Sequence, residues 1–257
     1  MESNPGLAET GGRRSRSPLA QGQKTMIRRL QNREEAGRML AERLTAYREV
    51  PDVVVLALPR GGVPVGFEIA RALRAPFDVF IVRKLGVPGY PELAMGAIAT
   101  GGMQYVDREL VSALHVPEAA VKAVVQRERA ELQRREKTYR GERPPLGLHG
   151  RTVILVDDGV ATGASLRAAI GALRKLNPAR VVVAVGVAPL STWQELRNQA
   201  DEVVCLLTPQ EFWAVSLLYE EFPEVSDEEV CRLLEASGKL ASPVASGGGR
   251  APERHSV

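Results

Sequence analysis

VILVDDGVATGAS, residues 153–165, carries the clearest signal for the fold in this sequence. It begins with four apolar residues, the pattern of a strand that is buried on both faces of a parallel sheet. Two adjacent carboxylates, Asp157 and Asp158, close that run, and small residues then lead into a helical pattern over 166–176. The stretch therefore predicts a strand, a loop beyond its carboxyl end, and a helix.

The loop after this strand has the composition of an anion-binding site. Its small residues allow backbone amides to approach an anion, and the N-terminus of the following helix favours negative charge. Two hydroxyl side chains add donors, and the two aspartates offer acceptors suited to sugar hydroxyls. A plain turn with an aspartate cap explains either aspartate alone, but the whole string favours a sugar-phosphate site. The loop residues are Ala161, Thr162, Gly163, Ala164 and Ser165.

Similar apolar, β-branched runs recur along the chain and alternate with helical patterns. The first helix has Asn32 as its cap and Glu35 three residues later, as in a capping box. Strands that alternate with helices predict an α/β fold with a mainly parallel sheet flanked by helices. The other predicted strands are Val53–Leu58, Phe77–Val82, Val181–Val187 and Glu202–Leu207, and further helices are predicted over 65–73, 192–199, 212–219 and 227–234.

An insertion over residues 85–150 precedes the strand that starts at Val153. Its Gly- and Pro-rich start, Gly86–Pro91, predicts a loop. A hairpin around residues 101–102 follows, and then a helix over 117–140 that is dense in Arg, Lys and Glu. A solvated helix with alternating charges is the favoured interpretation of this helix, and a surface that binds RNA or a protein partner is the alternative.

Two further segments fall where ligands bind in open α/β sheets, beyond the carboxyl ends of the strands. Arg60, Gly61 and Gly62 follow the first strand; the arginine can fork onto phosphate oxygens, and the glycines allow backbone amides to face them. Lys84 follows the second strand and can contact an anionic ligand. A turn or a solvated strand end explains each segment alone at least as well, but their positions favour binding.

The formal net charge of +3 comes from the two ends of the chain. Residues 30–238 carry a slight acidic excess, so binding of nucleic acid by this body is not expected. The ends are rich in Gly, Ser, Pro and Arg and lack apolar periodicity. We therefore predict disordered tails at 1–25 and 240–257 around one domain at 26–239.

The sequence also predicts the cellular compartment of the protein. No apolar run approaches the ~20 residues that span a bilayer. The first thirty residues lack the apolar stretch of a signal peptide. Cys205 and Cys231 have neither the number nor the spacing for a disulfide framework or a metal site. We expect a cytoplasmic protein with no membrane partner.

Residues 153–165 resemble the ribose-phosphate binding signature of type I phosphoribosyltransferases: an apolar strand, two acidic residues, variable residues, Thr-Gly, and a small or hydroxyl residue. The loop at 58–66 resembles the pyrophosphate-binding loop of that family, and 90–97 lies where these enzymes carry a mobile catalytic loop. A P-loop is excluded because it needs a lysine where Ala164 stands. Over residues 30–235 the chain resembles a poorly characterised bacterial branch of predicted phosphoribosyltransferases.

The resemblance implies a transferase of nucleotide metabolism. It would bind 5-phosphoribosyl diphosphate, transfer the phosphoribosyl group to a nitrogen acceptor of the nucleobase class, and release pyrophosphate. A lid from 85–105 would exclude water, Mg²⁺ would be the cofactor, and we expect a homodimer. The residues that would hold the diphosphate are Arg60, Lys84 and the amides of Gly61 and Gly62. Those for the ribose hydroxyls, directly or through Mg²⁺, are Asp157 and Asp158, and those for the 5′-phosphate lie in 161–165. The candidate catalytic residues are Arg60, Lys84, Asp157 and Asp158.

The acceptor and the activity stay open at this point. Purine enzymes of the hypoxanthine–guanine type carry an aspartate immediately before Thr-Gly, whereas Ala161 stands there in this chain, as in the adenine and xanthine enzymes. A hood over the base would come from 208–219, where Phe212, Trp213 and Tyr219 can stack on it, although their spacing also fits core packing. The alternative function is a non-catalytic protein of the same fold that senses 5-phosphoribosyl diphosphate.

Overall fold

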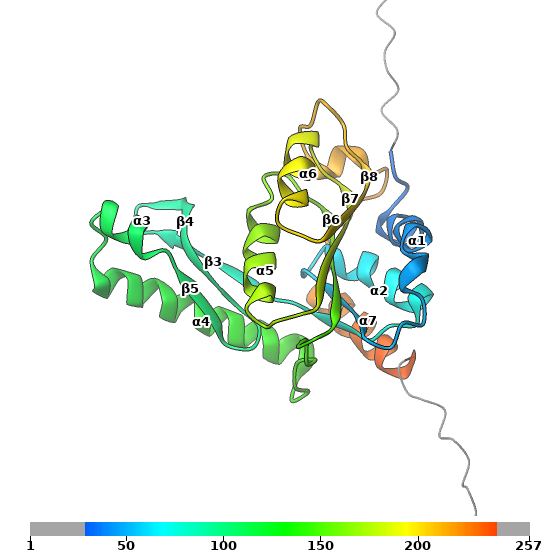
Figure 1. Ribbon diagram of the computed structural model, residues 1–257, viewed down its shortest axis with the longest axis horizontal. Helices are drawn as coiled ribbons and strands as arrows, with labels where there is room; N and C mark the ends of the chain where they lie inside the picture. The colour runs from blue at the N-terminus through cyan, green and yellow to red at the C-terminus, as the bar shows by residue number, and fades with distance from the viewer. Residues whose placement is uncertain (1–28, 241–257) are drawn as a thin grey trace, which may run out of the picture.

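The computed structural model describes residues 29–240. Apart from Leu240, the predicted tails at 1–25 and 240–257 lie outside the described residues. The described part contains a five-stranded sheet, from which a second, three-stranded sheet and its helices project as an arm (Figure 1). The arm comprises residues 82–140.

The central sheet is parallel throughout, with the order β2-β1-β6-β7-β8. Strands buried on both faces appear in sequence as continuous apolar runs, and all five residues of β1 are buried. The predicted parallel sheet is thus confirmed. Its strands are β1 (Val53–Ala57), β2 (Phe77–Val79), β6 (Thr152–Gly159), β7 (Arg180–Val187) and β8 (Glu202–Leu207).

Helices cover both faces of this sheet, because alternate strand residues point to opposite sides. Val53 and Val55 of β1 pack with α1 and α2, whereas Val54 and Leu56 pack with α5 and α6. The predicted cap is present, since Asn32 Oδ1 accepts a 2.9 Å hydrogen bond from the Glu35 amide. The helices around the sheet are α1 (Arg33–Arg43), α2 (Gly62–Leu73), α5 (Ala164–Arg174), α6 (Leu190–Arg197) and α7 (Asp227–Leu240), with 3-10 turns η1 (Thr45–Tyr47) and η2 (Val215–Leu218).

The arm is an antiparallel meander backed by a long helix (Figure 1). The apolar side of the charged helix, Val121, Val124, Val125 and Leu132, packs against the meander and is buried. At its far end, Arg140 Nε donates to Asp78 at 2.8 Å in a buried ion pair that ties the helix to β2. The elements are β3 (Val82–Val87), β4 (Tyr90–Ala99), β5 (Met103–Val106), α3 (Arg108–Ala113) and α4 (Glu118–Arg140).

Three sequence-based boundaries were wrong. Phe77–Val82 is not one strand: β2 ends at Val79, and β3 starts at Val82 in the other sheet. Gly86–Pro91 is not a loop, because β3 and β4 continue through it to a turn at 88–89. The helix predicted over 212–219 is only the short turn η2.

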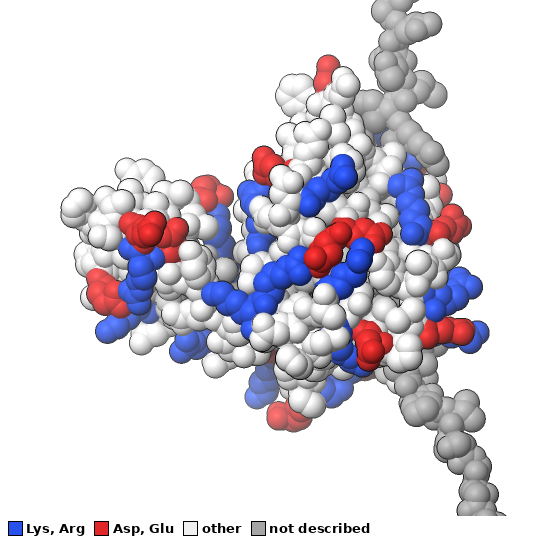
Figure 2. Space-filling view, viewed as in Figure 1, with Lys and Arg blue, Asp and Glu red and all other residues white. Residues whose placement is uncertain are grey.

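The surface carries mixed charge. Figure 2 shows Lys and Arg side chains interspersed with Asp and Glu on both the arm and the body. Within residues 29–240, no helix is both long and apolar enough to cross a membrane.

Candidate functional site

Two of the predicted binding segments meet at the carboxyl edge of the central sheet. Strands β1 and β6 are parallel neighbours, with Ala57 paired to Val156. Their carboxyl ends therefore lie side by side, and the loop at 58–62 faces the end of β6, which carries Asp157 and Asp158. This edge is where open parallel sheets bind ligands.

The glycines of the first loop are required by this close approach. A Cβ on Gly61 would collide with Asp158 Oδ2, and one on Gly62 would lie 2.7 Å from the carbonyl oxygen of Val156. The Pro59–Arg60 peptide bond before them is cis. The loop backbone is thus pressed directly against the aspartate pair, with no room for a side chain between them.

Asp158 is held in a buried network. Arg33 Nε donates to its Oδ2 at 2.7 Å, and both side chains are about nine-tenths buried. The Arg33 guanidinium also lies 3.7 Å from the centre of the Phe222 ring and donates to the carbonyl of Pro223 at 2.6 Å. Behind the strand, the Tyr219 hydroxyl donates to the Asp158 carbonyl oxygen at 2.6 Å.

Asp157 has a different environment. Its Oδ1 accepts a 3.0 Å hydrogen bond from the backbone amide of Asp158. Burial and the neighbouring Asp158 carboxylate raise the pKa of Asp157 well above its usual range. The cation nearest to the pair, Arg33, bonds to Asp158. Asp157 is therefore the carboxyl group of the pair that a hydroxyl donor or a cation would stabilise most.

The predicted anion loop is exposed and open at a helix N-terminus. Gly163 has a φ of +75°, immediately precedes α5 and has no side chain to cap that helix; the Ala164 amide donates to Thr162 Oγ1 in a long, 3.5 Å hydrogen bond. Thr192 Oγ1 of α6 donates to the Ala161 carbonyl at 2.9 Å and anchors the loop from outside. Thr162 and Ser165 are exposed. The first-turn amides of α5 thus face outward, beside two hydroxyl groups.

Arg60 extends toward acidic residues of the C-terminal segment. It forms an ion pair with Glu224, and its NH1 lies 3.9 Å from Asp227 Oδ1. Glu224 is 78% exposed, so this pair is of the solvent-screened kind that contributes little stability. The guanidinium can therefore exchange its carboxylate partner for a phosphate oxygen at small cost.

Lys84 lies on β3 and shares a cavity of about 580 Å³ with Ser165 of the anion loop. Its Nζ is 3.1 Å from the Glu92 carboxylate, which is almost fully exposed. Its neighbour Arg83 is instead fixed to Glu128 of α4 by hydrogen bonds of 2.5 and 2.9 Å. The structure thus brings Lys84, but not Arg83, into position as an available cation beside the anion loop.

The hood residues lie beyond β8 and differ among themselves. Trp213 is 84% exposed, and Phe212 packs partly against the cluster around Leu30 and Tyr219. Tyr219 is buried and bonds to Asp158, so the core-packing interpretation of that residue is confirmed.

Sequence reasoning missed Arg33, Glu224 and Asp227 as parts of this edge. Arg33 is the first residue of α1, 125 positions before its partner Asp158, and looks like any surface arginine of an amphipathic helix. The local pattern carries no signal for such a pairing. The only clue is that a buried aspartate needs a cationic or donor partner from somewhere in the chain.

Comparisons with known proteins identify the family of this chain. The family model described as phosphoribosyl transferase domain matches residues 23–220. Two Mycobacterium tuberculosis proteins, from strains CDC 1551 / Oshkosh and H37Rv and each named "Putative phosphoribosyl transferase", are 47% identical over 204 residues. That match covers 79% of this chain and 46% of each relative, so the chain spans about half the length of these relatives.

A solved structure of a related protein has a similar fold. The crystal structure of TT1426 from Thermus thermophilus is 43% identical, with a TM-score of 0.73 over 80% of this chain and 97% of that one. The family match covers well over half of the sequence and includes both loops at the carboxyl edge. The chain therefore belongs to the phosphoribosyltransferase family and has its type I fold.

Proposed function

We propose that this protein binds 5-phosphoribosyl diphosphate and transfers its phosphoribosyl group to a nitrogen acceptor of the nucleobase class. The observation that carries the proposal is the contact between Gly61 and Asp158, which leaves no room for a side chain between the loop at 58–62 and the end of β6. An arginine-glycine loop, a carboxylate pair and the N-terminus of α5 thus lie around one edge of the sheet. Diphosphate, ribose and 5′-phosphate need these three kinds of group.

Each part of the ligand has a matching set of residues. The exposed hydroxyls of Thr162 and Ser165 and the first-turn amides of α5 would bind the 5′-phosphate. The Asp157 carboxylate would accept hydrogen bonds from the ribose hydroxyls. Arg60, released from Glu224, would bind the diphosphate together with Lys84. Asp158 would keep the strand end in place through its buried pair with Arg33.

The donor set also fits Mg²⁺ bound largely by the substrate. Mg²⁺ in such sites takes one or two carboxylates together with phosphate oxygens and waters. Asp157, whose pKa is raised by burial and by Asp158, has a carboxylate that a cation would stabilise, and Asp158 adjoins it. When bound, Mg²⁺ would offset the charge of the diphosphate.

In the transfer step, the acceptor nitrogen forms a bond to C1′ of the ribose. The bond between C1′ and the diphosphate oxygen breaks, its electron pair leaves with pyrophosphate, and the acceptor N–H proton passes to solvent. Lys84 and Arg60 would stabilise the charge that builds up on the leaving group. The arm that carries Lys84 would act as the lid that excludes water, and Phe212 and Trp213 would border the acceptor.

The proposal extends to the metabolic role, the compartment and the oligomeric state of the protein. We place the protein in nucleotide metabolism, in the cytoplasm, as a homodimer. Measurement of its mass in solution by light scattering would test the last point, and a monomer at all concentrations would contradict it.

The decisive experiment is incubation with 5-phosphoribosyl diphosphate, Mg²⁺ and a panel of nucleobases, with pyrophosphate release as the readout. Release with one acceptor supports the transferase. Tight binding of the diphosphate without release for any acceptor supports the sensor instead. Absence of binding overturns the proposed site.

A matched pair of glycine variants tests whether ligand binding depends on the contact between Gly61 and Asp158. Gly61→Ala places a Cβ against Asp158, so we expect at least a tenfold loss of affinity for 5-phosphoribosyl diphosphate. Gly147→Ala adds a Cβ that meets no atom within 4 Å and serves as the control. Equal affinities for the two folded variants would contradict the assignment of this loop.

A further inference from the structure

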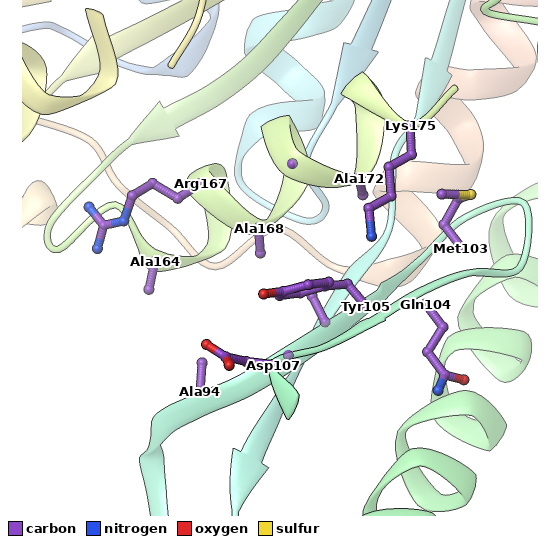
Figure 3. A pocket seen from close by; sticks show the side chains of 13 residues that line it. Ala94, Met103, Gln104, Tyr105, Asp107, Ala164, Arg167, Ala168, Ala172 and Lys175 are labelled. Carbon is purple, nitrogen blue, oxygen red and sulfur yellow. The ribbon is translucent and has the colours of Figure 1, made fainter. Parts of the chain in front are cut away.

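A second cavity, of about 440 Å³, lies between α5 and the β4–β5 hairpin of the arm (Figure 3). It is separate from the aspartate pair: neither Asp157 nor Asp158 lines it. The volume is within the range of small-molecule sites. Ala164 of the anion loop and residues of the proposed lid line it, but no part of 5-phosphoribosyl diphosphate is assigned to it above.

The floor of this cavity is the side formed by α5, and it is made of small residues. Ala164, Ala168, Gly171 and Ala172 face it, spaced as one side of a helix. A Cβ on Gly171 would meet no atom within 4 Å, so packing within the protein does not require glycine there. Glycine is less favourable than alanine inside a helix, and its presence leaves room for something other than this chain.

The arm supplies an aromatic wall opposite this floor. Tyr105 of β5 is 52% exposed and its ring lies toward α5 (Figure 3). A half-exposed tyrosine ring facing a flat floor of small residues forms a slot with the shape of a planar ring.

A lysine and an aspartate of opposite charge line the slot. Lys175, directly after α5, holds its Nζ over the Tyr105 ring, 4.5 Å from the ring centre, so a ligand ring that stacks there would displace this ammonium from the tyrosine face (Figure 3). Asp107 lies two residues beyond Tyr105, about 7 Å along the chain, and also lines the cavity. Arg167 points away in Figure 3 and pairs with Glu195 at 3.1 Å. The cation available inside the slot is thus Lys175. Asp107 caps α3 through its Oδ1, which accepts from the Leu110 amide at 2.9 Å, and its other carboxylate oxygen is the acceptor for a ligand.

We propose that this slot binds a planar aromatic anion, with the ring between Tyr105 and the small-residue floor, the anionic group at Lys175, and an N–H donor at Asp107. A nucleoside monophosphate with an amino group on its base and a small aminoaromatic acid both have this chemistry. The site would join the arm to α5. Ala97 pairs with both Lys84 and Tyr105, so the same row of the meander carries Lys84.

The test is isothermal titration of the full chain with two probes, adenosine 5′-monophosphate and 4-aminobenzoate. We expect at least one probe to bind, with an affinity at least tenfold weaker in Gly171→Leu, Tyr105→Ala and Lys175→Gln. Arg174→Gln is the matched control, because this cation belongs to the same helix but pairs with Asp201 outside the cavity. Circular dichroism establishes that each variant is folded, and Gly171→Leu adds its side chain to open space.

Asp157→Asn distinguishes this slot from the diphosphate site. In the slot, probe binding should be unchanged by this substitution, whereas a probe that occupies the 5-phosphoribosyl diphosphate site should lose affinity. The proposal is overturned if neither probe binds, if the three slot variants bind as the wild type does, or if Asp157→Asn abolishes binding. Binding of one probe alone identifies which kind of aromatic anion the slot accepts. None of these results depends on whether the protein is a transferase.

Discussion

Arg33 Nε lies 2.7 Å from Asp158 Oδ2, and this buried contact makes the two adjacent aspartates of the site unequal. Asp158 has a cationic partner within the fold, and its carbonyl accepts from Tyr219. Asp157 is desolvated and repelled by Asp158, which raises its pKa. Asp158 therefore stabilises the end of the strand. The ionised carboxylate of Asp157 is unfavourable in the free protein, and a ligand that donates to it would stabilise it.

The first prediction is that the two aspartates respond oppositely to neutralisation. Asp158→Asn should destabilise the protein by about 1.5–3 kcal/mol, the worth of a hydrogen bond to a charged group, because Arg33 stays buried without its counter-charge. Asp157→Asn should raise stability at pH 7 and yet lower the affinity for 5-phosphoribosyl diphosphate. Urea denaturation and calorimetric titration measure the two effects. Destabilisation of equal size in both variants would show that the pair acts as one structural unit.

The second prediction concerns pH. Because the folded-state pKa of Asp157 is raised above the ordinary value of 3.8, the folded state holds this proton more tightly than the unfolded state. The wild type should therefore lose stability relative to Asp157→Asn as the pH rises above that value, until the folded-state pKa is passed. Below pH 3.8, where Asp157 is protonated in both the folded and the unfolded state, the two proteins should be equally stable. Denaturation curves of both proteins across the acid range test this, and a constant difference at every pH would exclude the raised pKa as its cause.

The parallel sheet could be predicted from sequence because its strands are nearly continuous apolar runs rich in valine. Val53–Leu58 and Val181–Val187 correspond closely to β1 and β7. The same apolar pattern gave a wrong prediction at Phe77–Val82, because an apolar run does not show to which sheet each of its residues belongs. Here the chain leaves the parallel sheet after Val79 and enters the meander at Val82.

The errors in the arm have a similar physical cause. Glycine and proline in 86–91 suggest a loop, yet Gly86 is part of a strand pair in which a Cβ would lie 2.7 Å from the carbonyl oxygen of Pro91. Glycine there permits a close approach of two strands at an irregular register. In the site, the loops could be predicted because each follows a strand end, whereas the partners Arg33 and Glu224 are set by tertiary packing alone.

The third prediction follows from the ion pair between Arg60 and Glu224. A diphosphate must displace this carboxylate, so Glu224→Gln should increase the affinity for 5-phosphoribosyl diphosphate by roughly twofold to fivefold, as expected for a surface pair. Glu220→Gln, which removes an exposed charge from the same segment, is the control. Titration at low and high salt should show the difference shrinking with salt. A weaker affinity in Glu224→Gln would mean that this carboxylate positions Arg60 for the ligand.

The fourth prediction separates binding from chemistry. Contacts to the 5′-phosphate are present in both the ground state and the transition state, so Thr162→Ala should mainly weaken binding. Negative charge builds up on the diphosphate as its bond breaks, so Lys84→Ala should mainly slow turnover, by about 10²–10³ for the loss of one good electrostatic donor. Steady-state kinetics with the acceptor found in the release assay gives kcat and KM for each variant.

Lys137→Ala is the control for this last comparison, because it removes an exposed lysine of α4 that does not line the cavity around Lys84. Its kinetics should match those of the wild type. The roles assigned here are inverted if Lys84→Ala raises only KM while Thr162→Ala abolishes turnover at saturating substrate. Equal losses of kcat in both variants would instead mean that the 5′-phosphate loop and the arm act together in the transition state, as expected if the arm closes onto a correctly seated ligand.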